Sequence, residues 1–495
     1  MVKKLVAKYN SIPVQVKALF WFLICAFLQR GISFITTPIF TRLLNTTEYG
    51  QFNIFNSWLG ILTVIVSLNL CAGVYTRGVV KFSDDRRAFT SSMQGLSLTL
   101  TLVWTVIYFT THTFWNGVFS LTTFQMLCMF VMILSANIFG FWSMSQRVAF
   151  KYRSLVIVTL AMSAAKPVLG IILVKSATDK VTARIFGLAV VEALVCIVLF
   201  TLQAVRGRKF FSAFYWKHAL KFNIPLIPHY LSMTVLNSAD RIMIGKMVNE
   251  SSAGIYGLAY SISQIMTLFN TALLQTIDPW LYKRINDKRI KGISKAAYPA
   301  FVGIAAVNLL LIALAPEAVR IFAPPEYHDD IWIIPLVAMS VYFMFSYDFF
   351  AVFEFYYEKT KLIAAATTAG AVLNIVLNYI FIRIFGYYAA GYTTLVCYMV
   401  YAAFHMYFMR KICREQLNNE QPYSLRIYVG ITAAFLLLGF VFMASYNYII
   451  IRYSLLGIML VVITVFHKKI ISVINVSSMK IIKRGSTDYH RRVQD

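Results

Sequence analysis

The chain has 495 residues, of which 59% are hydrophobic and only 13% are charged. That charged fraction is about half the value of an average soluble domain, so composition excludes a water-soluble fold of this length. The formal net charge of +26 would suggest a nucleic-acid partner for a soluble protein, but here Lys and Arg lie between hydrophobic spans, which a membrane explains better.

Apolar runs of roughly 20 residues recur along the chain, each long enough to cross about 30 Å of hydrocarbon as an α-helix. The first run is too long for a signal-peptide core and is not followed by a small-residue cleavage site, so we expect it to be retained. We predict an all-α polytopic membrane protein without a separate soluble domain. About fourteen helices are expected, near residues 18–40, 51–75, 88–110, 122–145, 155–174, 185–204, 219–240, 253–279, 296–315, 331–354, 362–382, 388–409, 427–445 and 454–467.

Lys and Arg are concentrated in alternate connections between these spans. Because such residues favour the cytoplasmic side of a membrane, we predict that both termini are cytoplasmic, which requires an even number of crossings. The basic segment 468–492 is expected to rest on anionic lipid headgroups.

An internal repeat relates the two halves of the chain. Residues 45–52 (NTTEYGQF) align with residues 249–256 (NESSAGIY), 204 positions later. Six helices fit in this period, and because six is even, we expect two lobes related by a pseudo-twofold axis along the membrane normal. The predicted organisation is an N-terminal six-helix lobe (1–210), a C-terminal six-helix lobe (211–415), two additional transmembrane helices (416–470) and a basic cytoplasmic tail (471–495).

The segments around this repeat resemble a known family. Residues 42–50 (RLLNTTEYG) and 240–245 (DRIMIG), continuing into 253–256 (AGIY), are similar to the paired signatures of Wzx-type polysaccharide flippases. These belong to the multidrug/oligosaccharidyl-lipid/polysaccharide exporter superfamily. The resemblance extends over the whole chain in span count, repeat and length.

This resemblance implies two six-helix lobes around a central cavity, which opens alternately to the two sides of the bacterial cytoplasmic (inner) membrane. The implied cargo is an undecaprenyl-diphosphate-linked oligosaccharide for the biosynthesis of O-antigen, capsule or a similar polysaccharide. A polysaccharide polymerase and chain-length proteins are the implied protein partners.

A polar stripe on the first span is a candidate for substrate binding. Arg30 lies about midway between Lys17 and Arg42, which places it near the membrane midplane. An ionisable group at that depth is costly and is therefore a functional candidate. Arg30, Ser33 and Thr37 follow helical spacing and form one polar face on an otherwise apolar helix.

The equivalent span of the second half carries a matching stripe. It consists of Thr234, Asn237 and Arg241, and Tyr230 extends it toward the cytoplasm. Each stripe thus holds one arginine. A shared water-filled cavity explains both stripes better than two unrelated buried pairs, so we predict that both line the cargo site.

The fifth span adds Lys166, whose counterpart 208 positions later is Asn374. Asn378, the counterpart of Gly170, follows one turn further along. We assign Lys166, Asn374 and Asn378 to the predicted cavity. Glu192 on the next span lies at a depth similar to that of Lys166, and two interpretations stay open. The pair forms a structural salt bridge, or Lys166 faces the cargo.

Acidic residues within the spans are candidates for coupling transport to a H+ or Na+ gradient. Glu192 and Asp348 are retained as coupling candidates, whereas Asp278 and Glu354 are interpreted as solvated near the interface. The six cysteines show no paired or metal-binding spacing, so neither disulfides nor a metal site are expected. No catalytic constellation or cofactor motif occurs, which indicates a protein that is not an enzyme.

A lipid-linked saccharide has an anionic diphosphate that must avoid hydrocarbon, and Arg30, Arg241 and Lys166 are suited to bind it. The first alternative is a cation-coupled multidrug antiporter of the same superfamily, for which we would expect a carboxylate in the first-half cavity. The second is a membrane polysaccharide polymerase, which needs a sizeable outer loop, whereas the longest outer connection here, near 316–330, is short.

Overall fold

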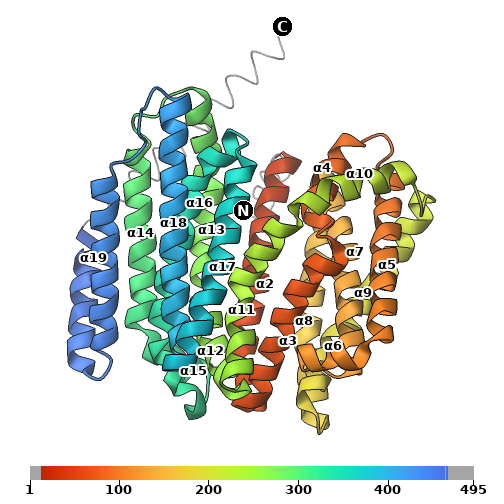
Figure 1. The fold of residues 1–495 in the computed structure, drawn as a ribbon, viewed down its shortest axis with the longest axis horizontal. Helices are drawn as coiled ribbons and strands as arrows, with labels where there is room; N and C mark the ends of the chain where they lie inside the picture. Colours follow the sequence, from red (N-terminus) through yellow and green to blue (C-terminus); the bar gives the residue numbers. More distant parts are fainter. Residues whose placement is uncertain (1–12, 463, 466–495) are drawn as a thin grey trace, which may run out of the picture. The chain divides into compact units, whose positions relative to one another are not determined.

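The computed structural model describes residues 13–462, 464 and 465, and all of its regular elements in that part are helices. The chain divides into two compact units, Met1–Gly254 and Ile255–Asp495, with the division in the first turn of one helix. The predicted lobe boundary at residue 210 follows the sequence repeat instead and stays a prediction. In Figure 1 the first unit runs from red to yellow-green and the second from green to blue.

The described helices before this division are α2 (Val14–Leu43), α3 (Thr46–Ser67), the π-helical turn η1 (Cys71–Tyr75), α4 (Thr76–Lys81), α5 (Arg86–Thr110), α6 (His112–Phe119), α7 (Thr123–Val148), α8 (Tyr152–Ser176), α9 (Lys180–Gly207), α10 (Ala213–Asn223), the 3-10 turn η2 (Ile224–Leu226) and α11 (Ile227–Met247). Helix α12 (Glu250–Ser263) contains the division. The second unit continues with α13 (Met266–Asn286), α14 (Ser294–Ala313), α15 (Ala315–Phe322), the 3-10 segment η3 (Pro325–Trp332), α16 (Ile334–Tyr356), α17 (Thr360–Phe385), α18 (Ala389–Gln416), α19 (Leu425–Ala444) and a helix at Ile449–Val462.

Each of the predicted spans overlaps one or more of these helices. Among the described residues, nine helices are long and apolar enough to cross a membrane. Helix α3 and the segment Cys71–Lys81, bent by 65° relative to each other, add a tenth if they are counted as one broken span rather than a re-entrant loop. The last predicted span, 454–467, is matched as far as Val462, and the basic tail lies outside the described residues. The prediction of an all-α polytopic membrane protein is therefore confirmed.

Three spans predicted as single helices are interrupted. Span 51–75 bends where Leu68 and Asn69 adopt left-handed φ angles of 51° and 50°, which end an α-helix. Span 219–240 breaks at η2, where Pro225 removes a backbone donor. Span 253–279 separates into α12 and α13 at Gln264, where no proline or glycine accounts for the break.

In the first unit, α9 packs against α7 and α8, α2 lies along α8, and α11 lies along α3. Its core holds fully buried aromatic and aliphatic side chains from these helices, such as Phe55, Ile133 and Phe141. In the second unit, α16 is the central helix and contacts α13, α14 and α18. Phe345, Phe349 and Phe350 of α16 are fully buried.

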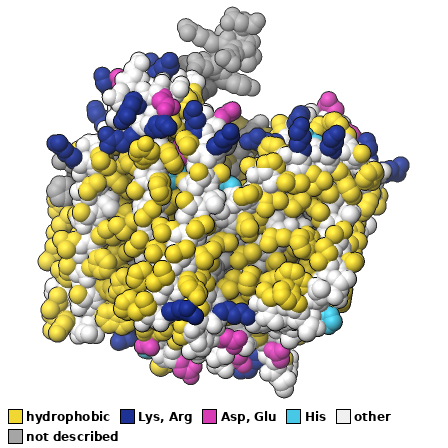
Figure 2. Space-filling view, in the orientation of Figure 1, with side chains coloured by type: hydrophobic (Ala, Val, Ile, Leu, Met, Phe, Trp, Pro, Cys, Tyr) yellow, Lys and Arg dark blue, Asp and Glu magenta, His cyan; other side chains and the backbone are white. Residues whose placement is uncertain are grey.

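Many large hydrophobic side chains remain exposed, including Val106 on α5, Ile197 on α9 and Val376 on α17. Figure 2 shows such side chains as a broad band on each unit, with Lys, Arg, Asp and Glu gathered toward its two ends. This distribution is that of a protein whose surface is solvated by lipid between two aqueous faces.

Candidate functional site

The two copies of the sequence repeat begin helices in the same way. The Asn45 side chain accepts a hydrogen bond from the Glu48 N–H at 2.8 Å, and the Glu48 carboxylate accepts one from the Asn45 N–H at 2.9 Å. The Asn249 side chain accepts a hydrogen bond from the Ser252 N–H at 2.7 Å. Asn45 and Asn249 thus cap α3 and α12 at positions 204 apart, so the repeat read from the sequence corresponds to a repeated helix start.

These two helix starts pack against each other at a pair of glycines. A Cβ atom added to Gly50 would lie 1.7 Å from the Glu250 backbone oxygen, and one added to Gly254 would lie 2.1 Å from the Thr46 backbone oxygen. Since Thr46 and Glu250 are themselves repeat counterparts, the contact is reciprocal. Only glycine permits so close an approach of two backbones.

Side chains beside the glycines reinforce this contact. The Ser251 hydroxyl donates a hydrogen bond to the Thr46 hydroxyl oxygen at 2.7 Å. The Gln51 amide donates one to the Glu250 carboxylate at 2.6 Å. We call this arrangement the glycine junction, which consists of Thr46, Gly50, Gln51, Glu250, Ser251 and Gly254.

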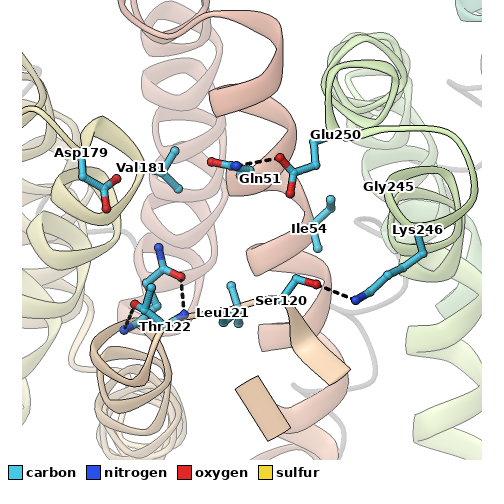
Figure 3. Close-up of a pocket in the computed structure, with 11 residues that line it drawn as sticks. Gln51, Ile54, Ser120, Leu121, Thr122, Asp179, Val181, Gly245, Lys246 and Glu250 are labelled. Atoms are coloured by element: carbon cyan, nitrogen blue, oxygen red, sulfur yellow. Dashed lines mark hydrogen bonds between the residues drawn. The ribbon is translucent and has the colours of Figure 1, made fainter. Parts of the chain in front are cut away.

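A pocket of about 350 Å³ opens next to the glycine junction. Figure 3 shows side chains from several elements around it, with the Gln51–Glu250 and Lys246–Ser120 hydrogen bonds on two of its sides. All of these elements belong to the first unit. Its lining residues are Gln51, Ile54, Ser120, Leu121, Thr122, Gln125, Asp179, Val181, Gly245, Lys246 and Glu250.

The predicted polar stripe of α2 lies on an accessible face of that helix. Arg30 and Ser33 are exposed and Thr37 is half-buried. The Ser33 hydroxyl donates to the Gln29 carbonyl at 3.2 Å, and the Thr37 hydroxyl donates to the Ser33 carbonyl at 2.9 Å. Arg30 is the only charged residue of α2 between Lys17 and Arg42. Its contact with cargo stays a prediction.

The matching stripe on α11 is more covered. Tyr230, Thr234, Asn237 and Arg241 are all half-buried, and the Arg241 guanidinium donates to the Asn237 carbonyl. A Cβ atom added to Gly60 of α3 would lie 3.4 Å from the Thr234 side chain. The second stripe therefore lies partly against α3, and its role in cargo binding likewise stays a prediction.

Lys166 of α8 and Glu192 of α9 form a salt bridge, with 2.5 Å between the ammonium nitrogen and Oε1. The Lys166 side chain is 30% exposed and that of Glu192 is 12% exposed. Of the two interpretations left open by the sequence, this geometry corresponds to the structural salt bridge. A carboxylate held in this way is neutralised by the lysine, and a direct role of Lys166 in cargo binding would require the pair to open.

We expect each charge of the Lys166–Glu192 pair to offset the cost of burying the other. Lys166→Ala or Glu192→Ala leaves a half-buried charge without its partner, which should destabilise the protein by about 1–2 kcal/mol, less than the loss for a fully buried pair. The double substitution should recover most of that loss, as measured by thermal stability in detergent. Additive losses in the double variant would show that the two charges do not compensate each other.

The two asparagines of α17 lie inside the second unit. Asn374 and Asn378 are fully buried, and the Asn378 amide donates to the Asn374 side-chain oxygen at 3.3 Å. The Thr393 hydroxyl of α18 donates to the Asn378 side-chain oxygen. The structure therefore places both residues in the packing between α17 and α18. Their assignment to a cargo cavity stays a prediction.

Glu354 corrects one sequence-based interpretation. We expected it to be solvated near the interface, but its side chain is fully buried, and Oε1 lies 2.7 Å from Nδ1 of His405 on α18. The rings of Tyr347 and Tyr401 pack against that histidine. Sequence gave no signal for this pair because its two members are 51 residues apart on different helices. The coupling candidate Asp348 lies half-buried on the same helix, α16.

Residues 16–285 match a family model described as polysaccharide biosynthesis protein, which is more than half of the chain. The chain is 21% identical over 358 residues to an uncharacterized membrane protein of Haemophilus influenzae, covering 67% of this chain and 82% of that protein. It is 24% identical over 166 residues to protein 1 of the Lsg locus of the same organism, covering 32% of this chain and 40% of that one. It is also 23% identical over 191 residues to a probable low-salt glycan biosynthesis flippase, Agl15, of Haloferax volcanii, covering 37% and 39% of the two chains.

Solved structures show the same fold at low sequence identity. A structure of the lipid II flippase MurJ in an inward closed conformation gives a TM-score of 0.63 at 13% identity, covering 92% of this chain and all of that one. An inward-facing multidrug resistance MATE transporter gives a TM-score of 0.59 at 14% identity, covering 78% of this chain and 95% of that one. The helical architecture is therefore that of multi-span transporters.

Proposed function

Because the chain belongs to the family of polysaccharide biosynthesis proteins, we propose that it is a flippase for an undecaprenyl-diphosphate-linked oligosaccharide. The cargo would pass from the cytoplasmic to the outer leaflet of the bacterial inner membrane, with both termini of the protein on the cytoplasmic side. The sugar would then serve the synthesis of O-antigen, capsule or a similar polymer, together with a polymerase and chain-length proteins. The fold of multi-span transporters supports this proposal.

The observation that carries the proposal is the exposed Arg30 on the apolar helix α2. A diphosphate that crosses hydrocarbon needs a cation at depth, and a guanidinium offers charge and several donors in a fixed plane. Arg241 would contribute the second charge from α11. Lys166 would contribute less, since Glu192 already neutralises it.

The proposed cycle alternates the access of this cationic site between the two sides of the membrane, at the expense of a H+ or Na+ gradient. Glu192 and Asp348 remain the proposed coupling groups. The glycine junction lies among connections assigned to the outer side by the Lys and Arg distribution. A cycle of this kind would require the ends of α3 and α12 to move at that junction.

A multidrug antiporter is the rival with the same fold. A cationic drug needs an accessible carboxylate, whereas the candidate stripe of α2 presents Arg30 and the Glu192 carboxylate is paired with Lys166. The observed charges therefore favour an anionic cargo. The fold is shared with multi-span transporters, which supports a protein that is not an enzyme.

The proposal is tested by the sidedness of the lipid-linked sugar. Spheroplasts of cells that lack the protein should hold the lipid-linked oligosaccharide on the cytoplasmic leaflet, protected from periodate, and the restored protein should make it accessible together with surface polymer. Accessible sugar in cells without the protein would contradict flipping by this chain.

Orientation is tested separately, with single cysteines in a cysteine-free background. Asn447 is exposed in the connection before the last described helix, and Arg289 is exposed in the connection after α13. The two test variants are Asn447→Cys and Arg289→Cys. An impermeant thiol reagent added outside should label the first and not the second. Reversed labelling would overturn the orientation and the assignment of the glycine junction to the outer side.

A further inference from the structure

The pocket beside the glycine junction is a site that the proposed diphosphate binding does not use. We propose that it binds the saccharide part of the cargo at the outer end of the first unit, after the cargo has left the cationic stripe. This inference rests on the proposed function for its cargo and orientation. The chemistry of the pocket itself selects the class of ligand.

The polar groups of the pocket offer both kinds of hydrogen bond. The Gln51–Glu250 bond uses the Gln51 amide nitrogen and one carboxylate oxygen, so the Gln51 oxygen and the other Glu250 oxygen remain as acceptors. One Asp179 oxygen accepts from the Thr182 N–H at 3.0 Å, which leaves its second oxygen. The Ser120 hydroxyl accepts from Lys246 at 2.5 Å and keeps its own hydrogen as a donor. Sugar hydroxyls donate and accept at once and match such a set.

The remaining walls of the pocket are apolar. Ile54, Leu121 and Val181 stand between the polar groups, as Figure 3 shows. A sugar ring presents C–H faces between its hydroxyls, so it requires this mixture of surfaces. The volume of about 350 Å³ lies at the lower end of the range for small-molecule sites and suits one or two sugar rings rather than a whole repeat unit.

The polar groups are held in place before any ligand arrives. Lys246 is fixed by Ser120, and a second, longer bond joins it to the Gly117 carbonyl at 3.4 Å. Asp179 caps α9, and Glu250 belongs to the glycine junction. Groups ordered in this way lose little entropy on binding, which distinguishes the pocket from a set of mobile surface side chains.

Other ligand classes fit less well. Within residues 13–462, 464 and 465, no group of three or more His, Cys, Asp or Glu side chains could hold a metal ion. A diphosphate would meet the two carboxylates of Asp179 and Glu250. We therefore assign the two parts of the cargo to different sites. The anionic diphosphate binds at the two arginines, and a neutral or amino sugar binds in this pocket.

Binding is tested on the purified full-length protein in detergent by saturation-transfer NMR with free monosaccharides. N-acetylglucosamine, galactose and glucosamine serve as probes, and glucuronate is the anionic comparison. We expect signals from the neutral and amino sugars and a much weaker one from glucuronate, which both carboxylates repel. No signal from any sugar, or a preference for glucuronate, would overturn the proposal.

Asp179→Asn is the discriminating variant. Asparagine caps a helix as well as aspartate does, so the start of α9 should persist, while the free carboxylate oxygen becomes an amide donor. We expect about tenfold weaker sugar binding, the usual loss for one charge-assisted hydrogen bond. Glu250→Gln should act similarly. Asp84→Asn, an exposed position outside the pocket lining, is the matched control and should bind as the parent does.

The proposal of sugar binding in the pocket and the proposal of flipping are contradicted by different results. Sugar binding that Asp179→Asn weakens would stand even if the spheroplast experiment found no flipping, and would then assign the pocket to another glycan process. Unchanged sugar binding in both Asp179→Asn and Glu250→Gln would remove the pocket while leaving flipping intact.

Discussion

Arg30→Glu is expected to abolish export of the polymer in a protein that is still made and inserted. The substitution places a carboxylate where the proposed site must attract a diphosphate, so electrostatic attraction becomes repulsion. Because the Arg30 side chain is exposed, the change should not disturb the packing of α2 on α8. The measurement is surface polymer per amount of membrane-inserted protein, with the periodate accessibility of the lipid-linked sugar.

Two further variants separate charge from geometry at this position. Arg30→Lys retains the charge without the planar set of donors and should retain partial export. Arg30→Gln removes the charge, and we expect a well-inserted protein with strongly reduced export. If the glutamate variant exported polymer normally, Arg30 would have no part in cargo binding.

Alanine at either glycine of the glycine junction should destabilise the first unit strongly. A Cβ at residue 50 would overlap a backbone oxygen at 1.7 Å, and one at residue 254 would do so at 2.1 Å. Backbone atoms cannot rotate away as a flexible side chain can, so α3 and α12 must separate. We expect a loss of about 3 kcal/mol, at the upper end for overpacking. Thermal unfolding in detergent measures it.

Because the two glycines contact the same pair of helix starts, we also expect their alanine substitutions to be non-additive in stability. Once α3 and α12 have separated for one methyl group, the second meets less resistance, so Gly50→Ala with Gly254→Ala should cost clearly less than the sum of the two. Gly303→Ala is the control, because a Cβ there meets nothing within 4 Å. Additive losses would show that the glycines act independently.

Hydrophobicity and the repeat predicted most of the architecture. Apolar runs are long in this chain, and the cost of an unpaired backbone in lipid leaves helices as the structure for them. The repeat offset of 204 also relates Asn45 to Asn249, which the structure shows as the caps of two helices, although the caps themselves were not predicted. The interruptions at Leu68 and Gln264 were not predicted, because apolar composition continues through them and neither contains a proline or glycine.

The candidate site was less accessible to prediction. A salt bridge between Lys166 and Glu192 could be considered from their similar depth on adjacent helices, but the sequence left a cargo-facing role of Lys166 equally open. His405 and Glu354 could not, because helical periodicity says which residues share a face and not which distant helix covers that face. The same limit applies to Asn374 and Asn378, which are polar but buried between two helices. The pocket was not predicted because its residues come from four separate stretches of the chain, within 51–54, 120–125, 179–181 and 245–250.

The reciprocal contact of Gly50 and Gly254 also bears on how a duplicated chain can diverge. If the two halves were identical, a glycine at this one repeat position would provide both sides of the contact. The same holds for the isologous interface of two identical subunits. Around it the two copies have since become different: Gln51 corresponds to Ile255, and Thr46 corresponds to Glu250. The glycines had no such freedom, because each one fits against the backbone of the other copy.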